Sequence, residues 1–235
     1  MSNVFGFSTA SAASGGDFMP IVKYDSRAGR MFRIDRSDTG QGFQNEPVDI
    51  TTEFRALADF ENVETGWIDF VAGSPPNFVL VSLRDLEEKR VQLPPKPSER
   101  HKNGIRFVVK LAKNCGGDKP IREIAGNARV FLTGIEAIYT AYKAEKANNP
   151  GKLPVIALER TIGVKSGSGE RQSTNYQPVF KIVGWSPRGD LQPAPKAQAS
   201  NGSGAHLPSP TPPATGSTRV EAPKAAQAQA EDDFG

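Results

Sequence analysis

Arginine side chains and aromatic rings are concentrated in one short segment near the N-terminus. Between Tyr24 and Arg36 the chain carries four arginines and two aromatic residues. Proteins hold single-stranded nucleic acid by stacking bases on rings and pairing phosphates with cations. In an extended strand Arg30 and Phe32 face one side and Arg33 the other, so we predict that all three contact DNA. An edge strand with one buried ring and solvated charges fits the same residues.

Trp67 is a second candidate for base stacking. It lies in an apolar run in which alternate residues of a strand face opposite sides. If Ile68 and Phe70 face the core, the indole of Trp67 faces outward and can stack on a base. The alternative is that Trp67 is itself a large core residue, because tryptophan is highly buried on average.

The segment 105–111 reads as a strand with one apolar side. Ile105, Phe107 and their alternate neighbours share the apolar side, whereas Arg106 and Lys110 share the other. A half-buried strand that shows cations on its open face is a candidate binding surface. We therefore predict that Arg106 and Lys110 contact DNA.

A polar loop over 165–175 joins the last two predicted strands. Lys165 and Arg171 lie in this loop, Tyr176 lies at its exit and Lys181 lies on the strand that follows. These four residues are predicted DNA contacts because they combine cations with a ring. The alternative is a solvated loop without a ligand.

Catalytic and metal-binding patterns are weak in this chain. One cysteine, Cys115, and two histidines, His101 and His206, supply neither a zinc ligand set nor a cysteine–histidine pair. The glycine-rich stretches match no phosphate-binding loop. Asp69 and Asp85 could bind Mg²⁺, but nothing marks a cluster around them. We predict no catalytic residue, no metal site and no cofactor.

Hydrophobic patterning predicts a mainly β fold of the α+β class. The expected strands cover 21–24, 31–35, 53–60, 66–71, 78–83, 105–111, 153–164 and 176–185. The strands at 53–60 and 66–71 read as a hairpin with a short acidic loop. Apolar residues then recur at three- and four-residue steps from Ile121 to Tyr142, which predicts a helix whose secure part is 127–147, with a possible break near Gly126.

The order of these elements matches an oligonucleotide-binding (OB) barrel. Such a barrel has five strands, with its helix between the third and fourth, and contacts nucleic acid through strands two and three and through the loop between strands four and five. The predicted barrel domain spans 20–188 and follows a flexible N-terminus at 1–19. The predicted strands fit in the order 53–60, 66–83, 105–111, 153–164 and 176–185. Other α+β sandwiches fit the same order.

The C-terminal part of the chain is a different kind of sequence. Residues 189–230 are rich in Pro, Ala, Ser and Gly and cannot bury a core, so we expect a disordered linker. The tip, 231–235, is acidic and contains one ring. Such a peptide can place its ring in an apolar pocket and its carboxylates on basic residues. Asp232, Asp233 and Phe234 are therefore predicted to bind partner proteins.

This tail resembles the C-terminal tails of bacterial and phage single-stranded DNA-binding proteins. In that family a disordered linker also runs into a few acids and a terminal Phe, although here Gly235 follows Phe234. The resemblance implies non-catalytic binding of single-stranded DNA in replication, recombination or repair. It also implies that the tip recruits replication or recombination proteins.

Composition narrows the remaining possibilities. The chain has 235 residues and a formal net charge of +3, which permits nucleic-acid binding without requiring it. One cysteine fits a reducing compartment, and the sequence shows neither a secretory signal nor an apolar run of about 18 residues. We expect a cytoplasmic protein of a bacterium or phage-infected cell, with a possible homo-oligomer.

Two other functions fit the same sequence. One is a structural or adaptor protein, such as a virion or host-interaction component, that binds protein rather than DNA. The other is a metal-dependent enzyme acting on nucleic acid.

Overall fold

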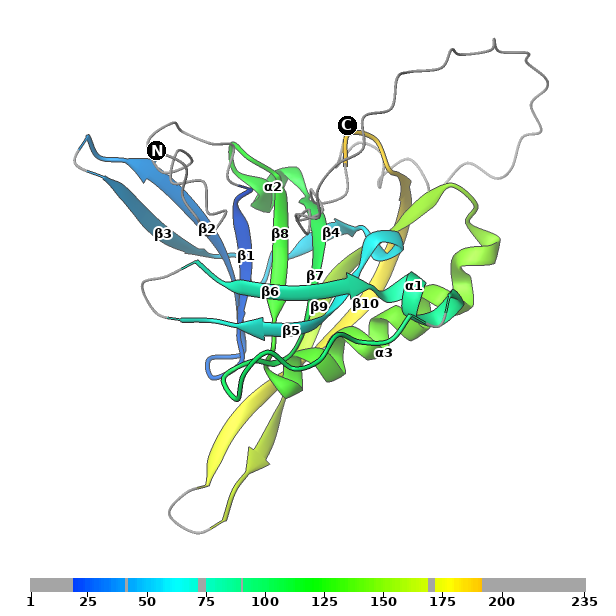
Figure 1. Cartoon of the computed structure of the whole chain (residues 1–235). Coiled ribbons are helices and arrows are strands. Elements are labelled where there is room, and N and C mark those ends of the chain that lie inside the picture. Colours follow the sequence, from blue (N-terminus) through cyan, green and yellow to red (C-terminus); the bar gives the residue numbers. More distant parts are fainter. Residues whose placement is uncertain (1–18, 41, 72–74, 90, 169–171, 192–235) are drawn as a thin grey trace, which may run out of the picture.

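The computed structural model describes residues 19–40, 42–71, 75–89, 91–168 and 172–191. Strands dominate, and one long helix accompanies them (Figure 1). The strands are β1 (Ile21–Asp25), β2 (Arg30–Asp38), β3 (Phe43–Asp49), β4 (Arg55–Ala58), β5 (Glu64–Asp69), β6 (Asn77–Ser82), β7 (Lys102–Leu111), β8 (Ile121–Gly126), β9 (Lys152–Ser166) and β10 (Ser173–Pro187). The helices are η2 (Phe60–Asn62), α1 (Leu83–Glu88), α2 (Lys113–Gly116), α3 (Arg129–Glu145) and η3 (Lys146–Asn148).

The strands form one curled sheet with the shape of a half-barrel (Figure 1). Its order is β10-β9-β4-β7-β8-β1-β2-β3, and β5 pairs with both β7 and β6. Strand β7 organises the sheet, because residues 102–106 pair with β5, residues 109–111 pair with β4, and its other edge pairs with β8. The β1–β8 pair is parallel, and the other pairs are antiparallel.

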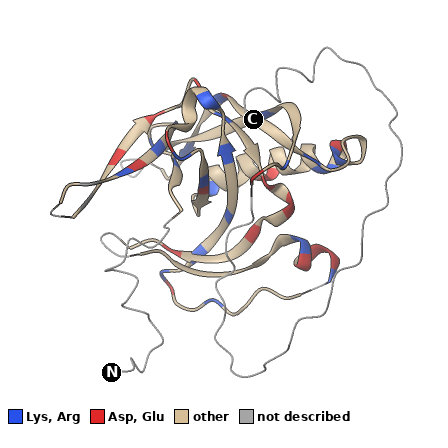
Figure 2. Cartoon of the chain, turned by 90° about the horizontal axis from the view of Figure 1, so that it is seen from above, with Lys and Arg blue, Asp and Glu red and all other residues tan. Residues whose placement is uncertain are grey.

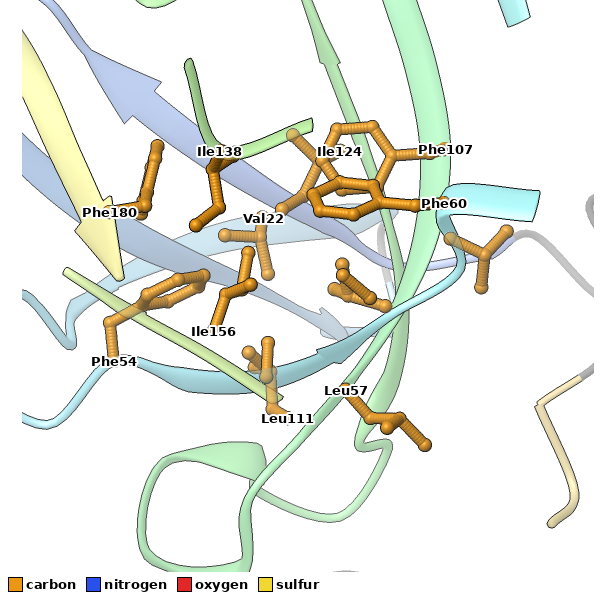
Figure 3. Packing of buried hydrophobic residues seen from close by; sticks show 14 of the residues in the cluster. Val22, Phe54, Leu57, Phe60, Phe107, Leu111, Ile124, Ile138, Ile156 and Phe180 are labelled. Atoms are coloured by element: carbon orange, nitrogen blue, oxygen red, sulfur yellow. The ribbon is translucent and has the colours of Figure 1, made fainter. Parts of the chain in front are cut away.

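The hydrophobic core lies between the inner side of this sheet and α3. The rings of Phe60 and Phe107 are 5.5 Å apart, and Ile124 and Ile138 lie beside them (Figure 3). Helix α3 contributes its periodic face, whose buried residues include Phe131, Gly134, Ile135, Ile138 and Tyr142. The predicted helix is confirmed, since apolar residues at three- and four-residue steps line one face.

A close contact fixes α3 against β10. Gly134 is buried, and a side-chain carbon added there would clash with the backbone oxygen and ring of Pro178. Only a residue without a Cβ lets the helix and the strand approach this closely. The glycine that weakens helix propensity in the sequence therefore serves packing.

The apolar period misled the prediction at residues 121–126. These residues were expected to begin the helical pattern, but they form β8, and α3 begins at Arg129. Buried Arg122 explains part of the error, because it interrupts the apolar pattern of a core strand. Its guanidinium donates to the backbone oxygen of Ile34 at 2.8 Å and to Asp35 at 2.7 Å.

The predicted hairpin over 53–71 is also wrong. Strand β4 ends at Ala58, η2 follows, and β4 pairs with β7 and β9 rather than with β5. Strand β5 instead forms its hairpin with β6. Strand β3, which pairs with β2, was not predicted, because its exposed Gln44, Asn45 and Glu46 give no apolar alternation.

The body of the protein continues to Leu191, beyond the predicted boundary at residue 188. Leu191 is fully buried, and Asp190 pairs with Lys110 at 3.0 Å. Arg188 donates to both carboxylate oxygens of Asp59 at 2.7 and 2.8 Å, and to Glu61 at 2.7 Å. We call these contacts of residues 188–191 the C-terminal anchor.

The anchor is electrostatic at its centre. Burial raises the pKa of Glu61, but the hydrogen bond from Arg188 and the nearby Lys146 outweigh burial and leave the pKa below its usual value. The same carboxylates raise the pKa of Arg188. Glu61 and Arg188 therefore both stay charged, and Arg188 forms an ion pair with the fully buried Asp59.

No helix among the described residues is long and apolar enough to cross a membrane.

Candidate nucleic-acid interface

A groove of about 440 Å³ runs between the β5–β6 hairpin and strands β1 and β8. Figure 1 shows that hairpin crossing in front of β1 and β8. We call this the β5/β8 groove; its lining includes Ile21, Lys23, Phe70, Phe78, Glu123 and Ala125. The volume falls within the range of small-molecule pockets, roughly 300–1,000 Å³.

Two phenylalanines form the hairpin side of the groove. The rings of Phe70 and Phe78 meet edge to face with centroids 6.3 Å apart. Phe70 is 45% exposed, and Val71 beside it is 37% exposed. An exposed ring next to an apolar groove is a surface on which a flat ligand can stack.

Arg106 lies against the Phe78 ring and not on an open face. Only 9% of it is exposed, and its guanidinium is 4.9 Å from the centre of the Phe78 ring. Its Nε donates to Glu64 at 2.8 Å. The prediction of an open cationic face on β7 is therefore wrong. Lys110, on the same face, is mostly covered and pairs with Asp190.

The three residues of β2 that were predicted to contact DNA lie on two sides of the strand, as its two-residue period requires. Phe32 stands opposite Lys23 and Arg30 opposite Asp25 in the β1–β2 register, so Arg30, Phe32 and Lys23 share one side of the sheet. Lys23 also lines the β5/β8 groove. Phe32 is half-buried, and Arg30 is exposed and pairs with Asp49 at 2.8 Å. This side of β1–β2 therefore continues the groove with a ring and two cations.

Arg33 points to the opposite side of β2 and has a structural role. Its Nε donates to Asp35 at 3.0 Å, and its Nη1 donates to the backbone oxygen of Cys115 at 2.9 Å. These contacts hold α2 against β2.

Trp67 is half-buried, and its indole nitrogen is already bonded. Nε1 donates to the backbone oxygen of Pro94 at 2.7 Å, so the segment after α1 partly covers the indole. Ile68 is a core residue as predicted, but Phe70 is exposed. The exposed ring here is therefore Phe70, directly after β5, although the prediction of an outward-facing Trp67 required Phe70 to face the core.

Strands β9 and β10 extend beyond the body as a long two-stranded arm (Figure 1). Lys165 is exposed on this arm, whereas Lys181 is exposed on the part of β10 that lies within the body, opposite Ala157. Tyr176 lies at the base of the arm, where its backbone nitrogen donates to Ser26 at 2.6 Å and its oxygen accepts from the Tyr24 hydroxyl at 2.9 Å. The arm is thus tied to the β1–β2 turn. Arg171, Asp232, Asp233 and Phe234 lie outside the described residues.

Charges in and around the groove are mixed. Figure 2 shows Lys and Arg interspersed with Asp and Glu over the described strands and helices. Burial raises the pKa of Glu123, against the lowering effect of Arg106. Burial also raises the pKa of Tyr24 to about 12, with a smaller effect of Asp25.

Groups with catalytic potential are dispersed. Among the described residues, no three His, Cys, Asp or Glu side chains form a possible metal site. Burial raises the pKa of the Cys115 thiol, which opposes thiolate formation. His101 is buried, with its Nδ1 2.8 Å from the Ser98 hydroxyl. Asp69 and Asp85 pair with Arg100 and Lys89, at 3.1 and 3.0 Å.

Comparison of the chain with protein-family models, curated proteins and solved structures found no match.

The residues that line the β5/β8 groove carry little signal in the sequence. Lys23, Phe78 and Glu123 lie on β1, β6 and β8, and Phe70 directly follows β5. Only the sheet pairing brings them together, so no local motif marks them.

Proposed function

We propose that this protein is a non-catalytic single-stranded DNA-binding protein whose half-barrel is an OB fold. The observation that carries the proposal is the strand order. Along the sheet, β10-β9-β4-β7-β8 is the order in which an OB barrel arranges its fifth, fourth, first, second and third strands. Helix α3 follows β8 and precedes β9, which is the place of the OB helix between the third and fourth strands.

This assignment differs from the one the sequence predicted. Strand β7 becomes the second strand and β8 the third, and the β5–β6 hairpin becomes part of the connection between the first and second strands. OB folds bind through the face of strands two and three and through the loops after the first and fourth strands. The β5/β8 groove is lined by β8 and by the β5–β6 hairpin. This lining supports the groove as the ligand site of the proposed OB fold.

The chemistry of the groove supports a single strand as the ligand. Phe70 offers a stacking surface, and Lys23 offers a cation for a phosphate. Arg30 and Phe32 continue the same side of the sheet. Lys165 on the arm, Tyr176 at its base and Lys181 further along β10, together with Arg171, form the second contact region. Arg106 supports the aromatic wall through Phe78 rather than pairing with a phosphate.

The tail completes the proposal. Residues 231–235 carry the acids and the ring that would recruit replication or recombination proteins, and their negative charge would compete with DNA for the body. Deletion of 231–235 is then expected to tighten DNA binding and to abolish partner recruitment. Unchanged DNA affinity in that variant would contradict the competition alone.

A titration of the intrinsic tryptophan fluorescence with a poly-dT oligonucleotide tests DNA binding. Affinity should fall steeply with salt, with a slope of about −0.7 per phosphate contact on a single strand. Lys23→Ala should reduce that slope by about one contact, whereas Lys89→Ala, on an exposed lysine outside the groove lining, should not. Micromolar or weaker binding at low salt, or binding insensitive to salt, contradicts the proposal.

A pull-down with and without nuclease separates DNA binding from the adaptor function. Partners that remain bound to a tail-deleted protein after nuclease treatment would favour an adaptor.

Phe70→Ala should weaken DNA binding by roughly 1–3 kcal/mol if a base stacks there. Leu93→Ala is its matched control, since Leu93 is similarly exposed at 44% and is not among the groove-lining residues.

A further inference from the structure

Glu123 is an unusual residue for the floor of an apolar groove. Its side chain is only 16% exposed, and it lines the β5/β8 groove with Ile21, Phe78 and Ala125. Its nearest cation is Arg106, whose Nη1 is 3.9 Å away. That separation exceeds hydrogen-bond length. Among the described residues, the carboxylate of Glu123 accepts no hydrogen bond.

The guanidinium of Arg106 is directed elsewhere. Its Nε donates to Glu64 at 2.8 Å, and its Nη2 donates to the same oxygen. Arg106 therefore forms its hydrogen-bonded ion pair with Glu64. The carboxylate of Glu123, which lines the groove, can still accept hydrogen bonds from a ligand. A carboxylate in an apolar environment is costly unless a donor bonds it. The groove consequently favours a ligand that brings a hydrogen-bond donor.

The shape of the groove limits what that ligand can be. Phe70 and Phe78 line one side, Phe70 is 45% exposed, and the volume is about 440 Å³. Lys23 lies on the opposite, β1 side. A flat ring with a donor on its edge and a phosphate attached matches these three features. A nucleotide of a DNA strand has all of them.

We propose that the β5/β8 groove binds one nucleobase that carries an exocyclic amino group, with the amino group donating to Glu123. The base stacks against Phe70, and its phosphate lies near Lys23. The inference rests on the proposed function and adds a base preference to it. Burial also raises the pKa of Glu123, as expected for a carboxylate that lacks donors in the free protein.

The preference follows from the edges of the bases. Cytosine presents an N4 amino donor where uracil and thymine present an O4 acceptor. An acceptor placed against a carboxylate is repelled, and the N3–H of uracil lies between two carbonyl oxygens that are repelled too. One such contact is expected to change affinity roughly fivefold or more between the two bases. Cytosine, adenine and guanine should therefore bind more tightly than thymine or uracil.

Oligonucleotides of dC and dU test this preference, because their bases lack the methyl group that distinguishes thymine. Strands of about 16 nucleotides, the upper site size of one OB fold, are titrated into the full-length protein at fixed salt. The wild-type protein should bind dC at least about fivefold more tightly than dU. Glu123→Leu should bring the ratio near one, chiefly by weakening dC binding.

Glu123→Gln provides a second variant in case the leucine variant does not fold. Its amide presents both a donor and an acceptor, so the dC/dU ratio should fall because dU binding improves. Glu136→Gln, an exposed carboxylate on α3 that is not among the groove-lining residues, is the control and should keep the wild-type ratio. Circular dichroism checks that each variant is folded.

Three results would overturn the proposed base preference, and the third would also contradict DNA binding. Salt-dependent binding of dC and dU with equal affinity contradicts the base preference and leaves DNA binding intact. A folded Glu123→Leu protein that keeps the wild-type ratio assigns the preference to another residue. Failure of both oligonucleotides to bind contradicts the proposed function, and the base preference falls with it.

Discussion

Replacement of Arg188 by methionine should destabilise the protein strongly, although Arg188 lies at the end of the body. Arg188 donates to both oxygens of Asp59, which is fully buried. Methionine keeps much of the apolar stem but removes the cation. Among the described residues, the Asp59 carboxylate would retain only the hydrogen bonds from the Asn62 side chain, at 2.9 and 3.1 Å. A buried carboxylate would then lack its counter-charge.

The magnitude follows from this arrangement. Breaking a buried ion pair by removing one partner costs roughly 3–5 kcal/mol. The Arg188 side chain is 28% exposed, so water can replace part of its contact, and we expect about 3 kcal/mol, the lower end of that range. For a body of this size the melting temperature should fall by about 6–12 °C.

Urea denaturation followed by tryptophan fluorescence measures the loss. Trp185 stacks on Tyr142 at 5.9 Å and lies on the strand that leads into the anchor. Arg160→Met is the matched control, because the Arg160 side chain is 64% exposed and, among the described residues, forms an ion pair only with its neighbour Glu159 at 3.5 Å. That variant should stay within about 0.5 kcal/mol of the wild type.

A double-mutant cycle with Asp59→Asn makes the test specific. Removing both charges should cost less than the sum of the two single losses, because neither partner is then left buried without the other. Additive losses, or a loss below about 1 kcal/mol for Arg188→Met, would refute the assignment of the anchor to this ion pair.

Three further predictions concern packing and titration. Gly134→Ala should destabilise by about 1–2 kcal/mol in urea, since the clash with Pro178 outweighs the gain in helix propensity; a stabilised variant would contradict the close approach. The stability of the folded protein should fall as the pH rises from about 10 to about 12, because the pKa of Tyr24 is raised to about 12 when folded; Tyr24→Phe should reduce that fall, and an unchanged pH profile would count against it. Cys115 should react with a thiol reagent only as fast as the protein unfolds, and rapid labelling of the native protein would be the contrary result.

The sequence allowed correct prediction of elements whose pattern is local. Strands β7, β9 and β10 combine β-branched residues with clear ends, and α3 shows an apolar face at helical spacing. Strand β8 could not be predicted, because buried Arg122 depends on Asp35, which lies far away in the sequence. The polar strand β3 gives no apolar alternation, and its place in the sheet comes from backbone pairing with β2.

The candidate interface was less predictable than the fold. The sequence identified the side shared by Arg30 and Phe32, and the register confirms it. It did not identify the groove, because Phe70 looked like a core residue and Glu123 like part of a helix. Arg106 was assigned to an open face, and only the fold places Glu64 and Phe78 over it.

The pairing of distant strands has a consequence for how the chain folds. Ile21 pairs with Glu123, and Arg55 pairs with Ala157, so the half-barrel depends on contacts between segments about a hundred residues apart. Domains dominated by such pairings fold slowly, on the scale of milliseconds to seconds. The ion pair between Asp59 and Arg188 also forms only after residue 188 has been synthesised. During synthesis, the N-terminal strands must therefore remain incompletely paired until β9, β10 and the anchor have emerged, and this interval is when the protein is most exposed to aggregation.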